Sequence, residues 1–429
     1  MQSKPVYVVD GARSPFLKAR NKPGPFSASD LAVQTGQQLI LRQPFAATDI
    51  NEVIIGCAAP APNETNIARI IALRLGCGHN VPAYTVMRNC ASGMQALDNA
   101  IMSIRSGRHN LVLAGGTEAM SRAPILISQQ YLNWLTHFNE SKSVLEKLKL
   151  VFRLRPSFLR PEPALLKGLT DPVVGLSMGQ TAENLAHMFN IKRSHMDAFA
   201  ARSHVLAKRA HERHIFDNEL IPITDAKGRL YNYDDGIRSD STPGNLAKLK
   251  AVFDKPWGNI TAGNSSQVTD GAALLILASE EAVNKYKLQP LGKIIDTQWA
   301  ALDPAIMGLG PVMASSPILI RQNLGLNNID IWEINEAFAA QVLSCLEAWN
   351  NEEWCQTNLG HSAFGELDID SLNVDGGAIA IGHPVGASGA RIVLHCLNTL
   401  KDRSLKTGMA TICIGGGQGG AMLLEASGA

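Results

Sequence analysis

Apolar and polar residues alternate along two stretches of the chain with the spacing of strands and helices. The first stretch predicts strands over residues 6–9, 53–56, 84–87 and 111–114, and helices over 32–41 and 90–104. The second predicts strands over 331–334, 409–414 and 421–424, the last two as a hairpin, and helices over 337–349 and 390–400. Strands alternating with helices are typical of an α/β fold with parallel layers.

The two stretches echo each other in sequence. CASG at 90–93 and GASG at 386–389 each begin a predicted helix, and AGG at 114–116 and IGG at 414–416 each follow or end a predicted strand. Two such matches at similar offsets within strand–helix–strand units favour an internal duplication over chance.

A segment of different character separates these stretches. It is rich in Arg, Lys, Ser and Pro, and it contains a helical stretch over 181–214 before an apolar strand at 271–277 returns the chain to the sheet. A smaller insertion is expected at 350–371. We therefore predict an N-terminal half at 1–122 and 249–279, an inserted loop domain at 123–248, and a C-terminal half at 280–429.

Composition and charge narrow the class of protein. The 429 residues include 39 Lys+Arg and 38 Asp+Glu, a balance that argues against nucleic-acid binding. Seven scattered cysteines form no CxxC pair, which argues against a zinc ribbon and predicts a reduced intracellular protein. No signal peptide and no apolar run of about 18 residues is apparent, so we expect a soluble, cytoplasmic chain.

Cys90 is the first candidate for chemistry, because it lies between a predicted strand and a predicted helix. The free N–H groups and the dipole at a helix start favour a thiolate. A sharp turn there would also lift the sulfur clear of the sheet. The alternative is a buried cysteine that merely packs at the start of a helix.

Three further candidates lie in the second stretch. His383 stands in a glycine-rich segment, 376–386, and is either a general base for a thiol or an ordinary loop residue. Cys413 precedes Gly415–Gly417, whose N–H groups either form an oxyanion hole or simply make a turn. These glycines are followed by a strand, not a helix, so they do not fit a dinucleotide fingerprint. Asn335 either positions a water or caps a helix.

Taken together, the motifs resemble the thiolase family, and they occur in family order over nearly the whole chain. The matching segments are DGARSPF at 10–16, NIAR at 66–69, NCASG at 89–93, TAGNSS at 261–266, TDGAA at 269–273, NEAFA at 335–339, GHP at 382–384 and CIG at 413–415. The resemblance implies the thiolase fold, in which two duplicated α/β halves form five layers, αβαβα, with an inserted loop domain.

The resemblance also implies a mechanism. Cys90 is expected to attack a 3-ketoacyl-CoA, His383 to take its proton, and Cys413 to protonate the acetyl-CoA enolate and activate the incoming CoA. Asn335 is expected to hold a water, and the backbone N–H groups of Cys90 and Gly415 to bind the oxyanion. Coenzyme A is then a co-substrate, and neither a metal nor a bound cofactor is expected.

Binding residues follow by the same resemblance. We expect Ala262 and Ser266 beside the pantetheine, Met178 and Leu246 as apolar walls, Arg238 against the adenine and phosphates, and Met307 in the acyl pocket. Ser177 stands where many short-chain biosynthetic thiolases carry His, which is a departure from that subgroup.

The insertions at 128–170 and 350–371 resemble those of the thiolase subunit of the fatty-acid β-oxidation complex. Residues 142–167 include seven basic and two acidic residues interleaved with apolar ones. Such a stretch either touches an anionic membrane or a hydratase/dehydrogenase subunit, or is a solvated helix over the active-site mouth. A homodimer or a dimer of dimers is implied.

A degradative 3-ketoacyl-CoA thiolase is therefore the leading hypothesis, with a biosynthetic acetoacetyl-CoA thiolase as the alternative. A ketoacyl synthase is disfavoured, because its active site pairs one Cys with two His. A non-catalytic CoA-binding scaffold is the remote alternative.

Overall fold

The computed structural model describes residues 4–20 and 22–427. Ten strands join in one mixed sheet, in the order β12-β13-β14-β11-β1-β10-β5-β3-β4, with β2 beside β10. The strands of the first half are β1 (Val6–Arg13), β2 (Leu17–Lys18), β3 (Glu52–Gly56), β4 (Ala83–Val86), β5 (Leu111–Ala119) and β10 (Thr269–Ser279). Those of the second half are β11 (Gly292–Ala301), β12 (Ile331–Ile334), β13 (Thr407–Ile414) and β14 (Gln418–Ala426).

The two halves meet at a narrow seam, where β1 pairs with β11 only through Tyr7 and Val8. Strand β3 runs parallel to β4 and β5, and β12 runs parallel to β13. The long strands β10 and β14 are antiparallel to their neighbours, so the sheet is mixed. The predicted 409–414 and 421–424 hairpin is present as β13–β14.

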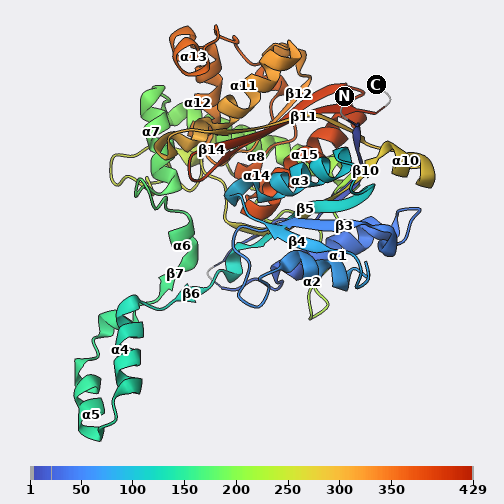
Figure 1. The fold of residues 1–429 in the computed structure, drawn as a ribbon. Coiled ribbons are helices and arrows are strands. Elements are labelled where there is room, and N and C mark those ends of the chain that lie inside the picture. The colour runs from blue at the N-terminus through green and yellow to red at the C-terminus, as the bar shows by residue number, and fades with distance from the viewer. Residues whose placement is uncertain (1–3, 21, 428–429) are drawn as a thin grey trace.

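Helices cover the outer faces of the two halves of the sheet and fill the space between these halves, which gives the five layers expected (Figure 1). Helices α1 (Ala28–Leu41) and α2 (Ile67–Arg74) lie outside the first half. Helices α11 (Gly310–Gln322) and α12 (Ala339–Asn350) lie outside the second, followed by α13 (Glu352–Leu359). Helices α3 (Ser92–Arg105) and α15 (Val385–Asp402) form the central layer, and α10 (Glu280–Tyr286) links the halves.

Glycines at the starts of α3 and α15 explain the sequence echo. A Cβ on Gly93 would lie 2.7 Å from the carbonyl oxygen of Gly386 and 3.2 Å from Cβ of Ala390. A Cβ on Gly389 would lie 2.7 Å from Cβ of Met94, the reciprocal contact. The two helices therefore touch backbone to backbone in a two-fold manner, as a duplicated unit packed against its copy requires.

The inserted segment contains a compact part and a projecting part. The compact part has α7 (Met178–Met188), α8 (Arg193–Glu212), α9 (Pro243–Leu246) and the small hairpin β8 (Ile223–Thr224) with β9 (Leu230–Tyr231). The helical stretch expected over 181–214 is made of two helices, α7 and α8. The chain breaks after α7 because Asn190 adopts a left-handed conformation, with φ 53°, and Ile191 turns inward as a buried residue.

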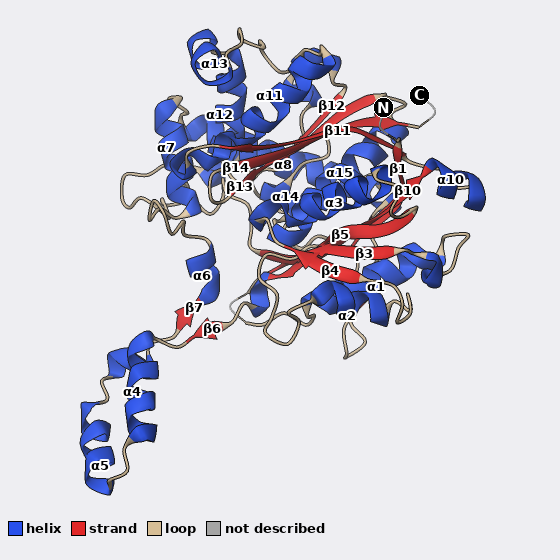
Figure 2. Ribbon diagram, viewed as in Figure 1, coloured by secondary structure: helices blue, strands red, loops and turns tan. Residues whose placement is uncertain are grey.

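The projecting part is an arm that stands clear of the body (Figure 2). It leaves and returns through a short ribbon of β6 (Ile125–Leu126) and β7 (Glu162–Pro163), carries α4 (Gln129–Glu140) and α5 (Val144–Arg153), and ends in α6 (Ala164–Gly168). Trp134 on α4 donates a hydrogen bond from Nε1 to the carbonyl of Leu150 at 2.8 Å, which ties the two arm helices together. Within the described residues no helix is both long enough and apolar enough to span a membrane.

Candidate active site

Cys90 lies in the tight turn Asn89–Ala91 between β4 and α3. Asn89 adopts φ 42°, a left-handed conformation that Asn tolerates better than most residues. Ser92 holds the turn, because its hydroxyl donates to the carbonyl of Asn89 at 2.7 Å and accepts from the N–H of Arg88 at 2.9 Å. The predicted helix accordingly begins at Ser92, and the cysteine precedes its first turn.

The turn is joined to the glycine-rich end of β13. The side-chain amide of Asn89 donates to the carbonyl of Gly415 at 2.7 Å, and the backbone N–H of Gly415 hydrogen-bonds the Cys90 thiol. Burial nevertheless raises the pKa of Cys90, and the hydrogen bond from Gly415 only partly opposes it. The expected thiolate-favouring effect of the helix start is therefore outweighed, and the half-buried thiol needs a base.

His383 meets the requirements for that base. It follows α14 (Ala378–Ile381) and Gly382, whose φ of 113° and contact with Thr269 leave no room for a side chain. Burial and the charge of Arg391 lower the pKa of His383 to about 4, so its imidazole is neutral near pH 7. Its Nε2 is buried and has no hydrogen-bond partner among the described residues.

Ser388 selects the tautomer of this imidazole. Its Oγ lies 2.6 Å from Nδ1 of His383 and donates to the carbonyl of Pro384 at 3.0 Å. With its proton engaged there, the hydroxyl accepts from an N–H at Nδ1. That assignment leaves the lone pair on Nε2, the atom free to accept a proton from a thiol.

Cys413 is the second thiol of the site. It is buried near the end of β13, two residues before Gly415, and both β13 and α15 pack against the turn that carries Cys90. Burial raises the pKa of Cys413 well above its usual value, and the neighbouring Cys90 and Cys345 raise it further. The packing of β13 against the turn that carries Cys90 makes these two thiols candidates for one site.

Asn335 lies directly after β12, and its backbone N–H donates to the carbonyl of Thr411 at 3.0 Å. It does not cap a helix, because α12 begins at Ala339 and Phe338 takes the capping position. Both polar atoms of its side chain are buried without a partner in the described part of the chain. A buried amide with nothing to bond to is suited to holding a water.

A cavity of about 410 Å³ opens beside Cys90. The residues that line it with Cys90 include Asn89, Met178, Gly415 and Gly416. The sulfur of Met178 lies 3.1 Å from the position a Cβ on Gly415 would take, so Met178 packs directly on the glycine turn.

The other predicted binding residues are spread around this centre. Arg238 lines a separate cavity of about 300 Å³ with His204, Lys208 and Arg209. Leu246 is buried and packs in the same apolar core as α7, while Ala262 is exposed. Ser266 donates its backbone N–H to the carbonyl of Ala337 at 2.9 Å, beside the start of α12.

Met307 does not line the Cys90 cavity. It is buried in the core of the second half, and Pro304 of the same short helix (Pro304–Leu309) contributes to the cavity wall instead. The sequence resemblance locates the segment but not the side chain that faces the cavity.

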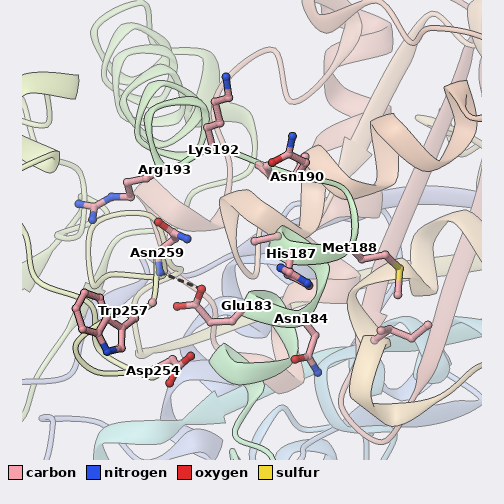
Figure 3. Close-up of a pocket in the computed structure, with 14 residues that line it drawn as sticks. Glu183, Asn184, His187, Met188, Asn190, Lys192, Arg193, Asp254, Trp257 and Asn259 are labelled. Carbon is pink, nitrogen blue, oxygen red and sulfur yellow. Dashed lines mark hydrogen bonds between the residues drawn. The ribbon is translucent and has the colours of Figure 1, made fainter.

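A larger cavity of about 970 Å³ lies between the end of α7, the start of α8 and the loop carrying Trp257 (Figure 3). The carboxylate of Glu183 accepts from the backbone N–H groups of Asn259 and Ile260 at 2.9 and 2.8 Å, so it fastens that loop. None of the four predicted catalytic side chains lines this cavity.

Sequence reasoning missed Glu118, which lines the Cys90 cavity from the end of β5. Its buried carboxylate accepts from the N–H groups of Ala58 and Ala59 at 2.8 and 3.1 Å and of Gly386 at 3.1 Å. It thereby joins the first half to the start of α15. The sequence offered one indication of this role: Glu118 is the only charged residue in the strand, and it stands two positions after Gly116.

The two packed α/β halves define the class of fold, and comparison with known proteins specifies the family. The thiolase N-terminal domain matches residues 6–281, and the thiolase C-terminal domain matches 288–426. A 3-ketoacyl-CoA thiolase of Serratia proteamaculans is 36% identical over 423 residues, covering 98% of this chain and 96% of that protein. The chain belongs to the thiolase family.

Solved structures agree with this assignment. The acetyl-CoA acetyltransferase of Bacillus anthracis matches with a TM-score of 0.85 and 36% identity, covering 99% of both chains. Human mitochondrial 3-ketoacyl-CoA thiolase in complex with CoA matches with a TM-score of 0.85 and 34% identity, covering 99% of this chain and 98% of that one.

Proposed function

We propose that the chain is a 3-ketoacyl-CoA thiolase of fatty-acid β-oxidation, which cleaves 3-ketoacyl-CoA with free CoA into acetyl-CoA and a shortened acyl-CoA. The observation that carries the proposal is the packing of β13, which carries Cys413, and of α15, which follows His383, against the turn that carries Cys90. The similarity to proteins named 3-ketoacyl-CoA thiolase supports it.

In the first half-reaction, Nε2 of His383 takes the proton of Cys90, and the thiolate attacks the 3-keto carbon. The resulting oxyanion is bound by the backbone N–H groups of Cys90 and Gly415. The bond between carbons 2 and 3 then breaks, which leaves the acyl group on Cys90 as a thioester and releases the acetyl-CoA enolate.

The enolate needs its own stabilisation, because a carbanion is a poor leaving group. The protonated His383 and a water on Asn335 donate to the enolate oxygen, and one preorganised donor is typically worth roughly 2.7–4 kcal/mol. Cys413 gives its proton to carbon 2, which completes acetyl-CoA. Its thiolate then takes the proton of the incoming CoA, whose sulfur attacks the thioester. Cys90 leaves as a thiolate and takes back the proton held by His383.

Two thiols are required because Cys90 is esterified while Cys413 moves protons. The high pKa of the buried Cys413 suits it to this exchange, since carbon acids are weak and need a strong conjugate base. CoA is the co-substrate, with Arg238, Leu246, Ala262, Ser266 and Met178 as its proposed contacts. No step in this scheme uses a metal or a redox cofactor.

A biosynthetic acetoacetyl-CoA thiolase is the second candidate, supported by the similarity to the acetyl-CoA acetyltransferase of Bacillus anthracis. Both candidates share the catalytic chemistry and differ in acyl chain length. Turnover of acetoacetyl-CoA compared with 3-ketohexadecanoyl-CoA separates them.

We also propose that the arm contacts an anionic membrane surface or a hydratase/dehydrogenase subunit through residues 128–170. One side of α5 presents an exposed apolar stripe: Val144 (84% exposed), Leu145 (62%), Leu148 (52%) and Phe152 (83%). Lys147, Lys149 and Arg153 flank the stripe, the pattern of a helix lying in a membrane interface. A homodimer or dimer of dimers is proposed as the assembly. A cytoplasmic location is proposed because all seven cysteines are free.

The test of the proposed function is a thiolysis assay on the purified chain with 3-ketoacyl-CoA and free CoA. Cys90→Ala should abolish turnover while CoA binding persists in calorimetry. Cys77→Ser, at a buried cysteine outside the site, is the matched control and should retain turnover. Turnover surviving in Cys90→Ala would refute the nucleophile assignment.

A further inference from the structure

The cavity beside Cys90 extends well beyond the space that the reacting atoms need. Its volume of about 410 Å³ equals that of on the order of ten water-sized groups, and a methylene is of similar size. From Cys90 it reaches the base of the arm, where α6 forms part of its wall.

The wall of the cavity is mostly apolar. Its polar side chains are those of Asn89, Cys90, Glu118, Thr170 and Asp171. The apolar side chains come mainly from three segments: Ala58, Ala59, Pro60, Met120, Ala123, Pro124, Ala164, Leu165, Leu169, Pro172 and Val173.

The two acidic residues in this wall already accept hydrogen bonds from backbone N–H groups. Asp171 accepts from the backbone N–H groups of Val173 and Val174 at 2.8 and 3.1 Å. Glu118 accepts from three backbone N–H groups, as described above. Because both carboxylates already have backbone partners, neither requires a polar group of the ligand, and the cavity suits an aliphatic chain.

Most of the residues proposed to bind CoA do not line this cavity. Of that set only Met178 lines this cavity, while Arg238 lines the separate cavity beside α8. A substrate bound through both sets therefore passes Cys90 and Met178 with its CoA portion on the Arg238 side. Its acyl portion then extends toward α6.

Resting on the proposed function, we propose that this cavity holds the tail of a medium- or long-chain 3-ketoacyl group, and that Leu165 on α6 limits the length accepted. Leu165 is partly buried against the cavity, and its neighbour Leu166 is 62% exposed. The N–H of Ala164 donates to the carbonyl of Pro124 at 3.0 Å, which holds α6 against the opposite wall. The arm thus supplies the specificity wall of the site.

The experiment measures kcat/KM for acetoacetyl-CoA and for 3-ketohexadecanoyl-CoA in the full chain. Leu165→Trp fills the outer part of the cavity. If two methylenes lose burial at about 0.8 kcal/mol each, the ratio of long-chain to short-chain kcat/KM falls about 15-fold. Leu166→Trp, on the exposed side of the same helix, should leave the ratio unchanged.

Ala59→Trp provides a second, independent obstruction, because Ala59 is exposed on a different segment of the wall and tolerates a larger side chain without burying it. It should lower the same ratio. An unchanged ratio in both tryptophan variants overturns the inference. So does an equal loss on both substrates with a raised KM for CoA, which assigns the cavity to the pantetheine arm. A wild-type chain that cleaves neither substrate refutes the proposed function and this inference with it.

Discussion

Removing the hydroxyl of Ser388 tests how the fold prepares its base. In Ser388→Ala the N–H at Nδ1 of His383 loses its acceptor, which lies 2.6 Å away in the structure. A buried donor left without a partner costs about 1–3 kcal/mol. Because the cost falls on the tautomer that leaves Nε2 free, the population of the competent base should drop by about 5- to 150-fold, and kcat/KM should drop with it.

Two measurements report this effect. The pH profile of kcat/KM should fall at every pH, since the loss concerns the position of a proton on the neutral ring. The ¹⁵N chemical shifts of His383 should show the protonated nitrogen moving from Nδ1 toward Nε2. Ser388→Thr keeps a hydroxyl and should restore most of the activity.

The matched control is Ser344→Ala, because the hydroxyl of Ser344 is also buried but has no hydrogen-bond partner in the described chain. It should leave both kcat/KM and the ¹⁵N shifts of His383 unchanged. Full activity with unchanged shifts in Ser388→Ala would show that Ser388 does not set the tautomer.

Four further predictions concern Cys413, two buried histidines and the arm. In Cys413→Ala, exchange of the α-protons of acetyl-CoA with deuterated solvent, followed by NMR, should stall, and undiminished exchange would count against its acid/base role. The free energy of unfolding, measured with a chemical denaturant, should fall as pH drops from about 6.5 toward 4. In this range His383 binds a proton in the unfolded chain but stays neutral in the folded one. Burial lowers the pKa of His395, but the carboxylates of Glu219 and Asp375 outweigh burial and raise this pKa to about 10. The stabilising contribution of His395 should therefore be lost as pH rises from about 6.5 to 10. A stability that does not change with pH in either range would contradict these assignments. Replacing Leu148 and Phe152 by Glu should abolish co-sedimentation with phosphatidylglycerol vesicles, whereas Leu41→Glu, at another exposed apolar position, should not.

Periodicity predicted the elements that are most regular. The buried stripe of α3 and the β13–β14 hairpin could be read from spacing alone, because both lie in the interior, where burial dictates residue type. The break between α7 and α8 could not, because Asn190 and Ile191 interrupt a pattern that otherwise continues. The direction of β10 was also inaccessible, since this strand is fully buried and its sequence reads the same whether it is parallel or antiparallel.

The site shows the same division. Motifs singled out Cys90, His383, Asn335 and Cys413, and the fold packs β13 and α15 against the turn that carries Cys90. The burial and the hydrogen-bond partners of these four side chains could be learned only from the structure. Burial raises the pKa of Cys90 where the sequence pattern favoured a thiolate, and the partnerless amide of Asn335 excludes the helix-cap interpretation. Glu118 and Ser388 act through contacts made across the two halves or within one helical turn, and no spacing rule marks them.

Mass spectrometry of the chain mixed with a 3-ketoacyl-CoA in the absence of free CoA tests the central claim most directly. The account predicts an acyl group, two carbons shorter than the substrate's, on the peptide that contains Cys90, and its release when CoA is added. An adduct on Cys413, or none during active turnover, would contradict it.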